Sequence, residues 1–261
     1  MGGKCIPGVQ LLVKPQKDKH GVLLGPHAMN PKYNTPKCEF ACQLLLCDET
    51  ALSANYIPTW VGAHPTLGES IAKELLNQNE LLFNQLPPIA SFKSQVGSIN
   101  GNMRPDFVVE HTNGRKRIVE VKTVVDTDYS VHWPLPDRTK CVYTSDDSTY
   151  MRTALFPWGN SKQIGPDGET VVSARAIKHV MEITKLVETG EYDATILFVV
   201  IRGDAKRFRP NHQACPSFAK YLKNSQEKGV QLLVKQVKWG ATGVDVGKCF
   251  DHGWIDIEWP A

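Results

Sequence analysis

Two apolar runs rich in β-branched residues, at positions 104–110 and 118–125, dominate the hydrophobic pattern of the chain. A polar stretch that contains Asn113-Gly114 separates them, so the pattern predicts a β-hairpin. Successive side chains of a strand point to opposite faces, which places Glu120 and Lys122 on one face and the intervening valines on the other, towards a core. The predicted hairpin therefore brings charged groups into apolar surroundings.

Other periodic segments predict the remaining secondary structure. Helical spacing of apolar residues indicates helices at about 66–82, 173–190 and 216–228. Short apolar runs indicate strands at 9–13, 40–46, 196–201 and 230–234, with loops at 21–36 and 126–170. A strand, a helix and a second parallel strand form a right-handed crossover. The order of elements therefore predicts an α/β protein with a mixed central sheet flanked by helices.

The turn of the predicted hairpin decides whether its charged groups can meet. With a tight two-residue loop at Asn113-Gly114, Asp106 would lie opposite Val121 and would miss Glu120. An odd number of loop residues, or a bulge, would instead bring Asp106 and Glu120 together. The sequence leaves both alternatives open.

Charged residues also flank two of the predicted helices. Thr66 and Glu69 have the spacing of a capping box at the start of the first helix. Glu74 borders the apolar stripe of that helix, and it either leans towards the packing partner or bends into solvent. The second helix carries charged and polar side chains opposite its buried stripe, a face that is commonly solvated: Arg175, Lys178, His179 and Glu182.

The composition is that of a folded protein with one large domain, or with a main domain and a smaller one. Of 261 residues, 41% are hydrophobic and 22% are charged. The formal net charge of +3 permits nucleic-acid binding without requiring it, so a local basic face would have to supply the attraction.

Features of the chain that report on its compartment point to a soluble, intracellular protein. No apolar run approaches the ~20 residues that cross a bilayer, and the first residues lack the apolar core of a signal peptide. The seven cysteines are therefore expected to be free thiols. Cys38, Cys42 and Cys47 form the only cluster, and their spacing favours buried thiols over a zinc site.

Asp106, Glu120 and Lys122 form the pattern Pro-Asp…Glu-x-Lys, which is typical of a large nuclease superfamily. Two carboxylates, joined by the backbone carbonyl of Val121, supply hard oxygen ligands to Mg²⁺ or Mn²⁺ and leave positions for water and phosphate. Such a metal stabilises charge on the phosphate and lowers the pKa of bound water. Lys122 would orient that water or neutralise the developing charge. The alternative is an ordinary salt bridge between Glu120 and Lys122 on a sheet face.

Residues 60–237 resemble the sugar fermentation stimulation protein family. Six stretches match in order and spacing: 60–62 (WVG), 91–96 (SFKSQV), 104–107 (RPDF), 119–124 (VEVKTV), 175–179 (RAIKH) and 207–210 (RFRP). The resemblance implies a restriction-endonuclease-like, PD-(D/E)XK domain at 59–240 with a loop inserted at about 126–170, followed by a tail at 241–261. Residues 1–8 resemble the middle of the family's N-terminal OB-like barrel, so 1–58 are expected to form a partial barrel that lacks its first half.

The resemblance further implies a DNA-binding protein with a Mg²⁺ or Mn²⁺ centre. Asp106, Glu120 and the Val121 carbonyl would bind the metal, and Lys122 would assist catalysis. Glu74 matches an acidic position of the preceding helix and is a further candidate catalytic residue. The protein would bind DNA largely independently of its sequence. No membrane partner is expected, and a homodimer is compatible with the resemblance. The candidate DNA contacts are Arg104, Arg175, Lys178 and His179.

Two departures from the family pattern separate the functional hypotheses. Gln95 stands where the family commonly has Glu, and Ile177 stands where it has Gln, so polar groups are lost near the site. The first hypothesis is a metal-dependent DNA endonuclease or exonuclease. The second is a regulatory DNA-binding protein that keeps the nuclease fold without turnover. The third is a metal-binding structural protein with no nucleic-acid partner.

Overall fold

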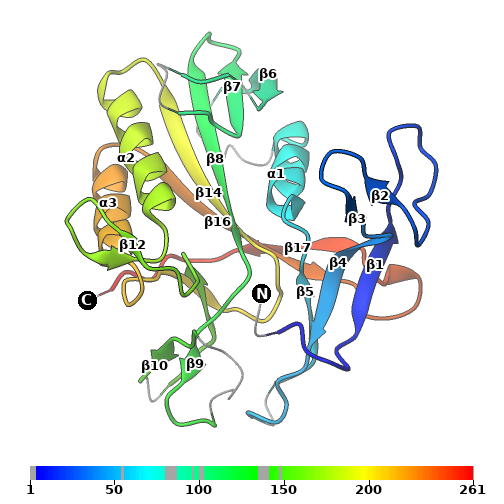
Figure 1. Ribbon diagram of the computed structural model, residues 1–261. Coiled ribbons are helices and arrows are strands. Elements are labelled where there is room, and N and C mark those ends of the chain that lie inside the picture. The colour runs from blue at the N-terminus through cyan, green and yellow to red at the C-terminus, as the bar shows by residue number, and fades with distance from the viewer. Residues whose placement is uncertain are drawn as a thin grey trace.

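A mixed central sheet runs through the middle of the protein, in the strand order β17-β16-β14-β8-β7-β6 (Figure 1). The computed structural model describes residues 4–53, 56–79, 87–95, 97–99, 103–134, 141–146 and 149–260. The three parallel strands at the centre are β8 (Lys116–Val124), β14 (Asp193–Val200) and β16 (Gln231–Trp239). The antiparallel strands at the two edges are β6 (Ile89–Ser94), β7 (Phe107–His111) and β17 (Cys249–Trp254). The predicted α/β class with a mixed sheet is confirmed.

Two helices cover one face of the sheet. They are α2 (Ala174–Glu188), which connects β8 to β14, and α3 (Pro216–Glu227), which connects β14 to β16. Crossovers between parallel strands are right-handed, so two successive crossovers in the same direction place both helices on the same side. Ser173 begins α2 as predicted, because its Oγ accepts a hydrogen bond from the Ala176 amide at 3.3 Å.

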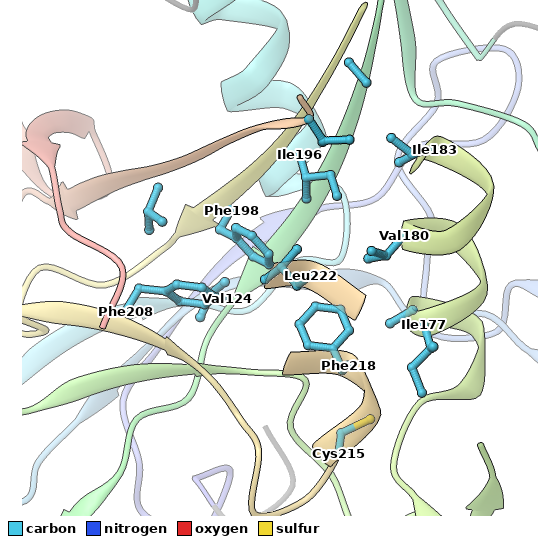
Figure 2. Packing of buried hydrophobic residues seen from close by; sticks show 14 of the residues in the cluster. Val124, Ile177, Val180, Ile183, Ile196, Phe198, Phe208, Cys215, Phe218 and Leu222 are labelled. Atoms are coloured by element: carbon cyan, nitrogen blue, oxygen red, sulfur yellow. The ribbon is translucent and has the colours of Figure 1, made fainter. Parts of the chain in front are cut away.

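The apolar stripe of α2 packs on this face of the sheet together with α3. Ile177, Val180 and Ile183 are fully buried; the first two belong to the predicted stripe, whereas Ile183 was not part of it. Figure 2 shows these side chains pointing towards Phe198 of β14 and Phe218 of α3. The packing fixes both the position and the rotation of α2 above the middle of β8.

The opposite face of the sheet carries α1 (Leu67–Asn77) (Figure 1). Its buried residues include Gly68 and Ala72, and the helix contacts the valines of β8. A Cβ at Gly68 would lie 2.1 Å from Thr123 Oγ1, so only glycine permits this close approach. The predicted capping box is wrong: Thr66 makes no side-chain cap in the described structure, and its Oγ1 lies 2.9 Å from His64 Nδ1.

The N-terminal region forms a separate antiparallel sheet in the order β1-β4-β5. Its strands are β1 (Leu11–Pro15), β4 (Phe40–Cys47) and β5 (Thr59–Gly62), and the short hairpin of β2 (Met29–Asn30) and β3 (Thr35–Pro36) lies within the predicted loop. The Gly62 amide donates to the Ile201 carbonyl at 2.9 Å, which joins this sheet to the end of β14. The partial barrel expected at residues 1–58 stays a prediction.

A buried network of charges, which we call the Arg202 network, ties the N-terminal sheet to the centre. Arg202 is 0% exposed, and it donates two hydrogen bonds to Asp204, at 2.6 and 2.7 Å. Arg152 Nη2 lies 2.6 Å from Glu49 Oε2, which follows β4. The Arg202 network contains three positively and three negatively charged residues: Lys4, Arg152, Arg202, Glu49, Asp126 and Asp204. Charge is therefore balanced within the network.

The pKa values in the Arg202 network favour the charged forms. Burial raises the pKa of the Glu49 carboxyl, but Arg152 and Arg202 outweigh it and lower that pKa to about 2. Burial also raises the pKa of the Asp204 carboxyl, but Arg202 outweighs it and holds that pKa well below its usual range. Both carboxylates are therefore stabilised by the neighbouring guanidinium groups.

The segment predicted as a long loop at 126–170 contains short strands. Asp128 holds it in place by accepting hydrogen bonds from the Thr153 amide at 2.9 Å and from Arg209 at 3.1 Å. Two-residue strands are too short to show a periodic pattern in the sequence, which explains the error. The strands are β9 (Tyr129–Ser130), β10 (Thr144–Ser145), β11 (Thr153–Phe156), β12 (Gln163–Ile164) and β13 (Thr170–Val171), and β11 pairs with β15 (Arg207–Pro210).

The C-terminal segment crosses the molecule after the short 3₁₀ helix η1 (Gly243–Asp245). Strand β17 pairs with β16, and the Phe208 amide of β15 then donates to the Asp256 carbonyl at 3.1 Å. The domain boundaries at 58, 240 and 241 stay predictions. All seven cysteines are free thiols. Within the described ranges, no helix combines the length and the apolar character needed to cross a bilayer.

Candidate metal centre

The turn between β7 and β8 has an odd number of residues. His111 donates its amide proton to the Arg115 carbonyl at 2.9 Å, which leaves a three-residue loop at 112–114. Gly114 closes the loop with φ of +80°, the conformation that a three-residue hairpin loop requires. Phe107 pairs with Val119, so Asp106 extends the register to the position opposite Glu120. The two carboxylates therefore share one face of the sheet.

Asp106 lies just before β7, and its side chain replaces a backbone carbonyl as the acceptor for an amide of β8. Its Oδ2 accepts a hydrogen bond from the Val121 amide at 2.7 Å, because β7 no longer runs beside β8 at this point. Burial, and then the negative charge of Glu120, raise the pKa of the Asp106 carboxyl to about 6. The Val121 hydrogen bond and Lys122 act against this rise, and Glu69 adds to it. The carboxylate of Asp106 therefore lacks enough positive charge nearby.

Glu120 is 2% exposed, and its two oxygens have different surroundings. Oε1 accepts hydrogen bonds from Lys122 Nζ at 2.6 Å and from His179 Nδ1 at 2.5 Å. Oε2 is buried and has no hydrogen-bond partner in the described part of the chain. Burial raises the pKa of Glu120, but the hydrogen bonds from His179 and Lys122 outweigh it, so the pKa lies below its usual value. The expected salt bridge to Lys122 exists, yet it uses only one of the two oxygens.

The start of α2 contributes the next group of side chains. Arg175 and Lys178 are exposed, whereas His179 is only 19% exposed and turns towards the sheet. His179 therefore does not share the solvated face on which the sequence placed it. Arg175 Nε donates to His179 Nε2 at 3.5 Å, which links the basic end of α2 to Glu120. Arg104 is exposed two residues before Asp106.

On α1 the acidic residue beside the site is Glu69, not Glu74. Glu69 acts on the Asp106 carboxyl, whereas Glu74 is exposed and accepts a hydrogen bond from Gln78 at 2.8 Å. The buried stripe of α1 is centred on Ala72, which turns Glu74 to the far side of the helix. The assignment of Glu74 to the site is corrected accordingly. Knowledge of which apolar residues are buried would have identified Glu69 from the sequence.

The two positions that depart from the family pattern have different surroundings. Gln95 is exposed with φ of +49°, and its backbone N–H donates to the backbone carbonyl of Asp106 at 2.9 Å. Ile177 is 0% exposed in the core, so no polar group replaces the one that is lost there. No group of three or more His, Cys, Asp or Glu side chains in the described ranges is placed to hold a metal ion. Any cation at the hairpin would need backbone or water oxygens as well.

Comparisons with known proteins identify the relatives of this chain. The family model described as "Sugar fermentation stimulation protein RE domain" matches residues 166–243. The matched segment contains Arg175, Lys178 and His179, whereas Asp106 and Glu120 precede it. Sugar fermentation stimulation protein homologs of Trichodesmium erythraeum and Desulfotalea psychrophila are each 28% identical to the chain, over 212 and 179 residues.

The two alignments cover 80% and 68% of this chain and 67% and 59% of the relatives, so the chain spans only about two thirds of their length. A solved structure of SfsA from Pyrococcus furiosus, in complex with Ca²⁺, matches with a TM-score of 0.58 and 18% sequence identity. That match covers 90% of this chain and 76% of the Pyrococcus chain, and it shows that the fold is shared. The chain is thus similar in sequence and in fold to proteins of the sugar fermentation stimulation protein family.

Proposed function

We propose that this chain binds DNA and hydrolyses phosphodiester bonds with the help of Mg²⁺ or Mn²⁺ at the hairpin. One observation carries the proposal: among the residues that the structure describes, the buried carboxylate oxygen Glu120 Oε2 has no hydrogen-bond partner, and it lies beside a second carboxylate, Asp106, whose pKa is raised to about 6. Buried polar atoms are normally paired, so an unpaired carboxylate oxygen favours a site that receives a cation.

The oxygen atoms at the site fit a hard divalent cation. Asp106 and Glu120 supply carboxylate oxygens from opposite positions of one sheet face. The N–H and C=O of a strand residue point to the same side, so the Val121 carbonyl faces the space that β7 has left. The Ca²⁺ complex of the Pyrococcus furiosus relative supports a cation of this class. Glu69 adds negative charge from α1, which attracts a cation further.

The side chains around the site have separate tasks in this proposal. A bound divalent cation supplies a Lewis acid for the phosphate and lowers the pKa of its water. Lys122 Nζ donates one hydrogen bond to Glu120 Oε1, and its two other N–H groups would hold a phosphate oxygen or the attacking water. Arg175, Lys178 and Arg104 are exposed near the hairpin and would hold the DNA backbone through its phosphates.

A second candidate function is DNA binding without turnover. Ile177 is buried where the family pattern has a polar residue, so the start of α2 offers one polar group fewer near the site. In this case the basic side chains would still bind DNA, with an affinity that falls as salt is added. Neutralising Arg175 and Lys178 together would then weaken DNA binding.

Cleavage assays on plasmid and on short single-stranded DNA, in Mg²⁺ and in Mn²⁺, test the proposal. We expect cleavage by the wild type and a loss of about a hundredfold or more in Asp106→Ala and in Lys122→Ala. Lys185→Ala is the matched control, because Lys185 is an exposed lysine on α2 that pairs with Glu182. Cleavage by Asp106→Ala at the wild-type rate would refute the proposal. DNA binding without any cleavage by the wild type would favour the second candidate.

A further inference from the structure

His179 holds an unusual place among the basic residues at the start of α2. Arg175 and Lys178 point into solvent, but His179 reaches the sheet and contacts Glu120. We infer that His179 is a positioning residue: it fixes one oxygen of Glu120 and thereby presents the other oxygen to the cation. This inference rests on the proposed metal centre, and it replaces the DNA contact expected for this residue.

Two donors from different elements converge on the same oxygen. Lys122 belongs to β8 itself, and His179 comes from α2, yet both donate to Glu120 Oε1, at 2.6 and 2.5 Å. The terminal torsion of a glutamate side chain is broad, so a single donor would leave the carboxyl group free to turn. Two donors from different elements restrict that rotation and keep Oε2 in one place.

The hydrogen bonds determine which ring nitrogen of His179 carries the proton. The guanidinium of Arg175 can only donate, so His179 Nε2, which lies 3.5 Å from Arg175 Nε, must accept. The proton therefore lies on Nδ1, which is the atom that donates to Glu120. Both nitrogens are engaged, and no ring N–H remains for a DNA phosphate. A partner that fixes the tautomer and the ring orientation is typical of the residues that support metal ligands.

The core beneath α2 makes this arrangement rigid. Ile177 lies two residues before His179 and Val180 follows it, and both are fully buried against the sheet. The helix cannot rotate without moving these side chains out of a packed core. His179 is thus held above Glu120 by the same residues that build the fold, which suits a group whose task is to orient another.

The test measures Mn²⁺ affinity by calorimetry on the full chain, without DNA. We expect His179→Ala to weaken Mn²⁺ binding by about ten- to a hundredfold. His179→Asn should restore affinity to within about threefold, because the Asn amide nitrogen occupies the place of Nδ1 and can donate to the same oxygen. Lys185→Ala is the control on the same helix, and we expect it to leave Mn²⁺ affinity unchanged.

Binding of a short DNA duplex in the presence of EDTA provides the second readout. We expect Lys178→Ala to weaken DNA binding and His179→Ala to leave it unchanged. Urea unfolding curves establish that each variant is folded, so that a loss of affinity is not a loss of structure.

Three outcomes would overturn the inference. His179→Ala could bind Mn²⁺ as tightly as the wild type while Glu120→Ala does not; the metal centre would then stand and the positioning role would fall. His179→Asn could fail to restore affinity, which would show that the donated hydrogen bond is not the cause. Finally, a wild type that binds no Mn²⁺ would refute the metal centre and the inference together.

Discussion

The Arg202 network and the hairpin site both bury carboxylates, but they balance charge in opposite ways. In the network each carboxylate has a cationic partner, and the pKa of Glu49 falls to about 2. At the hairpin two carboxylates lie on one face, the pKa of Asp106 rises to about 6, and Glu120 Oε2 has no partner in the described residues. Each carboxylate of the network lies beside a cation, whereas the hairpin lacks positive charge. Perturbation of that second kind is typical of functional sites.

The comparison also explains why burial alone does not identify a site. Arg202 is more deeply buried than Asp106, yet the Asp204 carboxylate accepts two hydrogen bonds from its guanidinium and compensates its charge. The useful distinction is whether a buried charge has its counter-charge within the chain. Three changes test whether this distinction holds, from the largest expected effect to the smallest.

Replacing Arg202 should produce the largest change in stability. Arg202→Met removes the cation between Asp204 and Glu49 and leaves these two buried carboxylates to share the guanidinium of Arg152. Loss of one partner from a buried ion pair costs about 3–5 kcal/mol in the free energy of unfolding. Urea unfolding measures this loss. Arg115→Met is the control: Arg115 pairs with Asp193 on the surface, and exposed pairs contribute little. Equal unfolding midpoints for the two variants would show that the network does not stabilise the fold.

Asp106→Asn should increase the free energy of unfolding, whereas Arg202→Met should decrease it. The folded pKa of about 6 lies above the usual value of 3.8, so the folded state favours the protonated carboxyl. Ionisation therefore destabilises the fold above pH 6, and this penalty disappears as the pH falls towards 3.8. A neutral Asn removes the penalty and still accepts the Val121 hydrogen bond. We expect a gain of about 1–2 kcal/mol at pH 7.5 in EDTA, after allowance for solvent screening, and a smaller gain at pH 4.5.

Thermal unfolding at the two pH values measures this gain as a rise in Tm. Asp204→Asn is the matched variant, because the pKa of Asp204 is lowered and its charge stabilises the fold. We expect Asp204→Asn to lower Tm at pH 7.5. A decrease in Tm for both variants would remove the proposed difference between the two clusters.

The smallest expected effect concerns the acidic residues of α1. Glu69→Gln removes a charge that acts on Asp106, so Mn²⁺ binding should weaken by about two- to fivefold. Glu74→Gln should bind Mn²⁺ like the wild type, since Glu74 faces solvent and contacts Gln78. Calorimetry on the two variants, side by side, provides the measurement. An equal loss in both would return Glu74 to the list of candidate site residues.

Strong periodic patterns allowed much of the fold to be predicted. The stripe of α2 spans several turns, and Ser173 is a capping residue at its start, so both the helix and its boundary could be read from the sequence. The strands of two residues between 126 and 170 have no period to detect. Their placement depends on Asp128 and Arg209, which are distant in sequence and meet only in the folded chain.

The sequence pattern selected residues of the candidate site that lie close together, but not the geometry around them. Asp106, Glu120 and Lys122 were identified by their pattern, and the structure brings them together on one side of the hairpin. The choice between Glu69 and Glu74 required the rotation of α1, which its tertiary contacts set. The contact of His179 with Glu120 required the packing of α2 on the sheet. A sequence pattern does not contain either of these long-range relations.

The three-residue turn at 112–114 has a consequence for how the gene of this chain can change. Deleting or inserting a single codon there would shift the pairing of β7 and β8 by one position or force a bulge. Asp106 would then move to the face opposite Glu120, although no site residue had been altered. In an alignment of this chain with its relatives, a one-residue gap in this exposed turn is therefore as informative as a substitution at Asp106 itself.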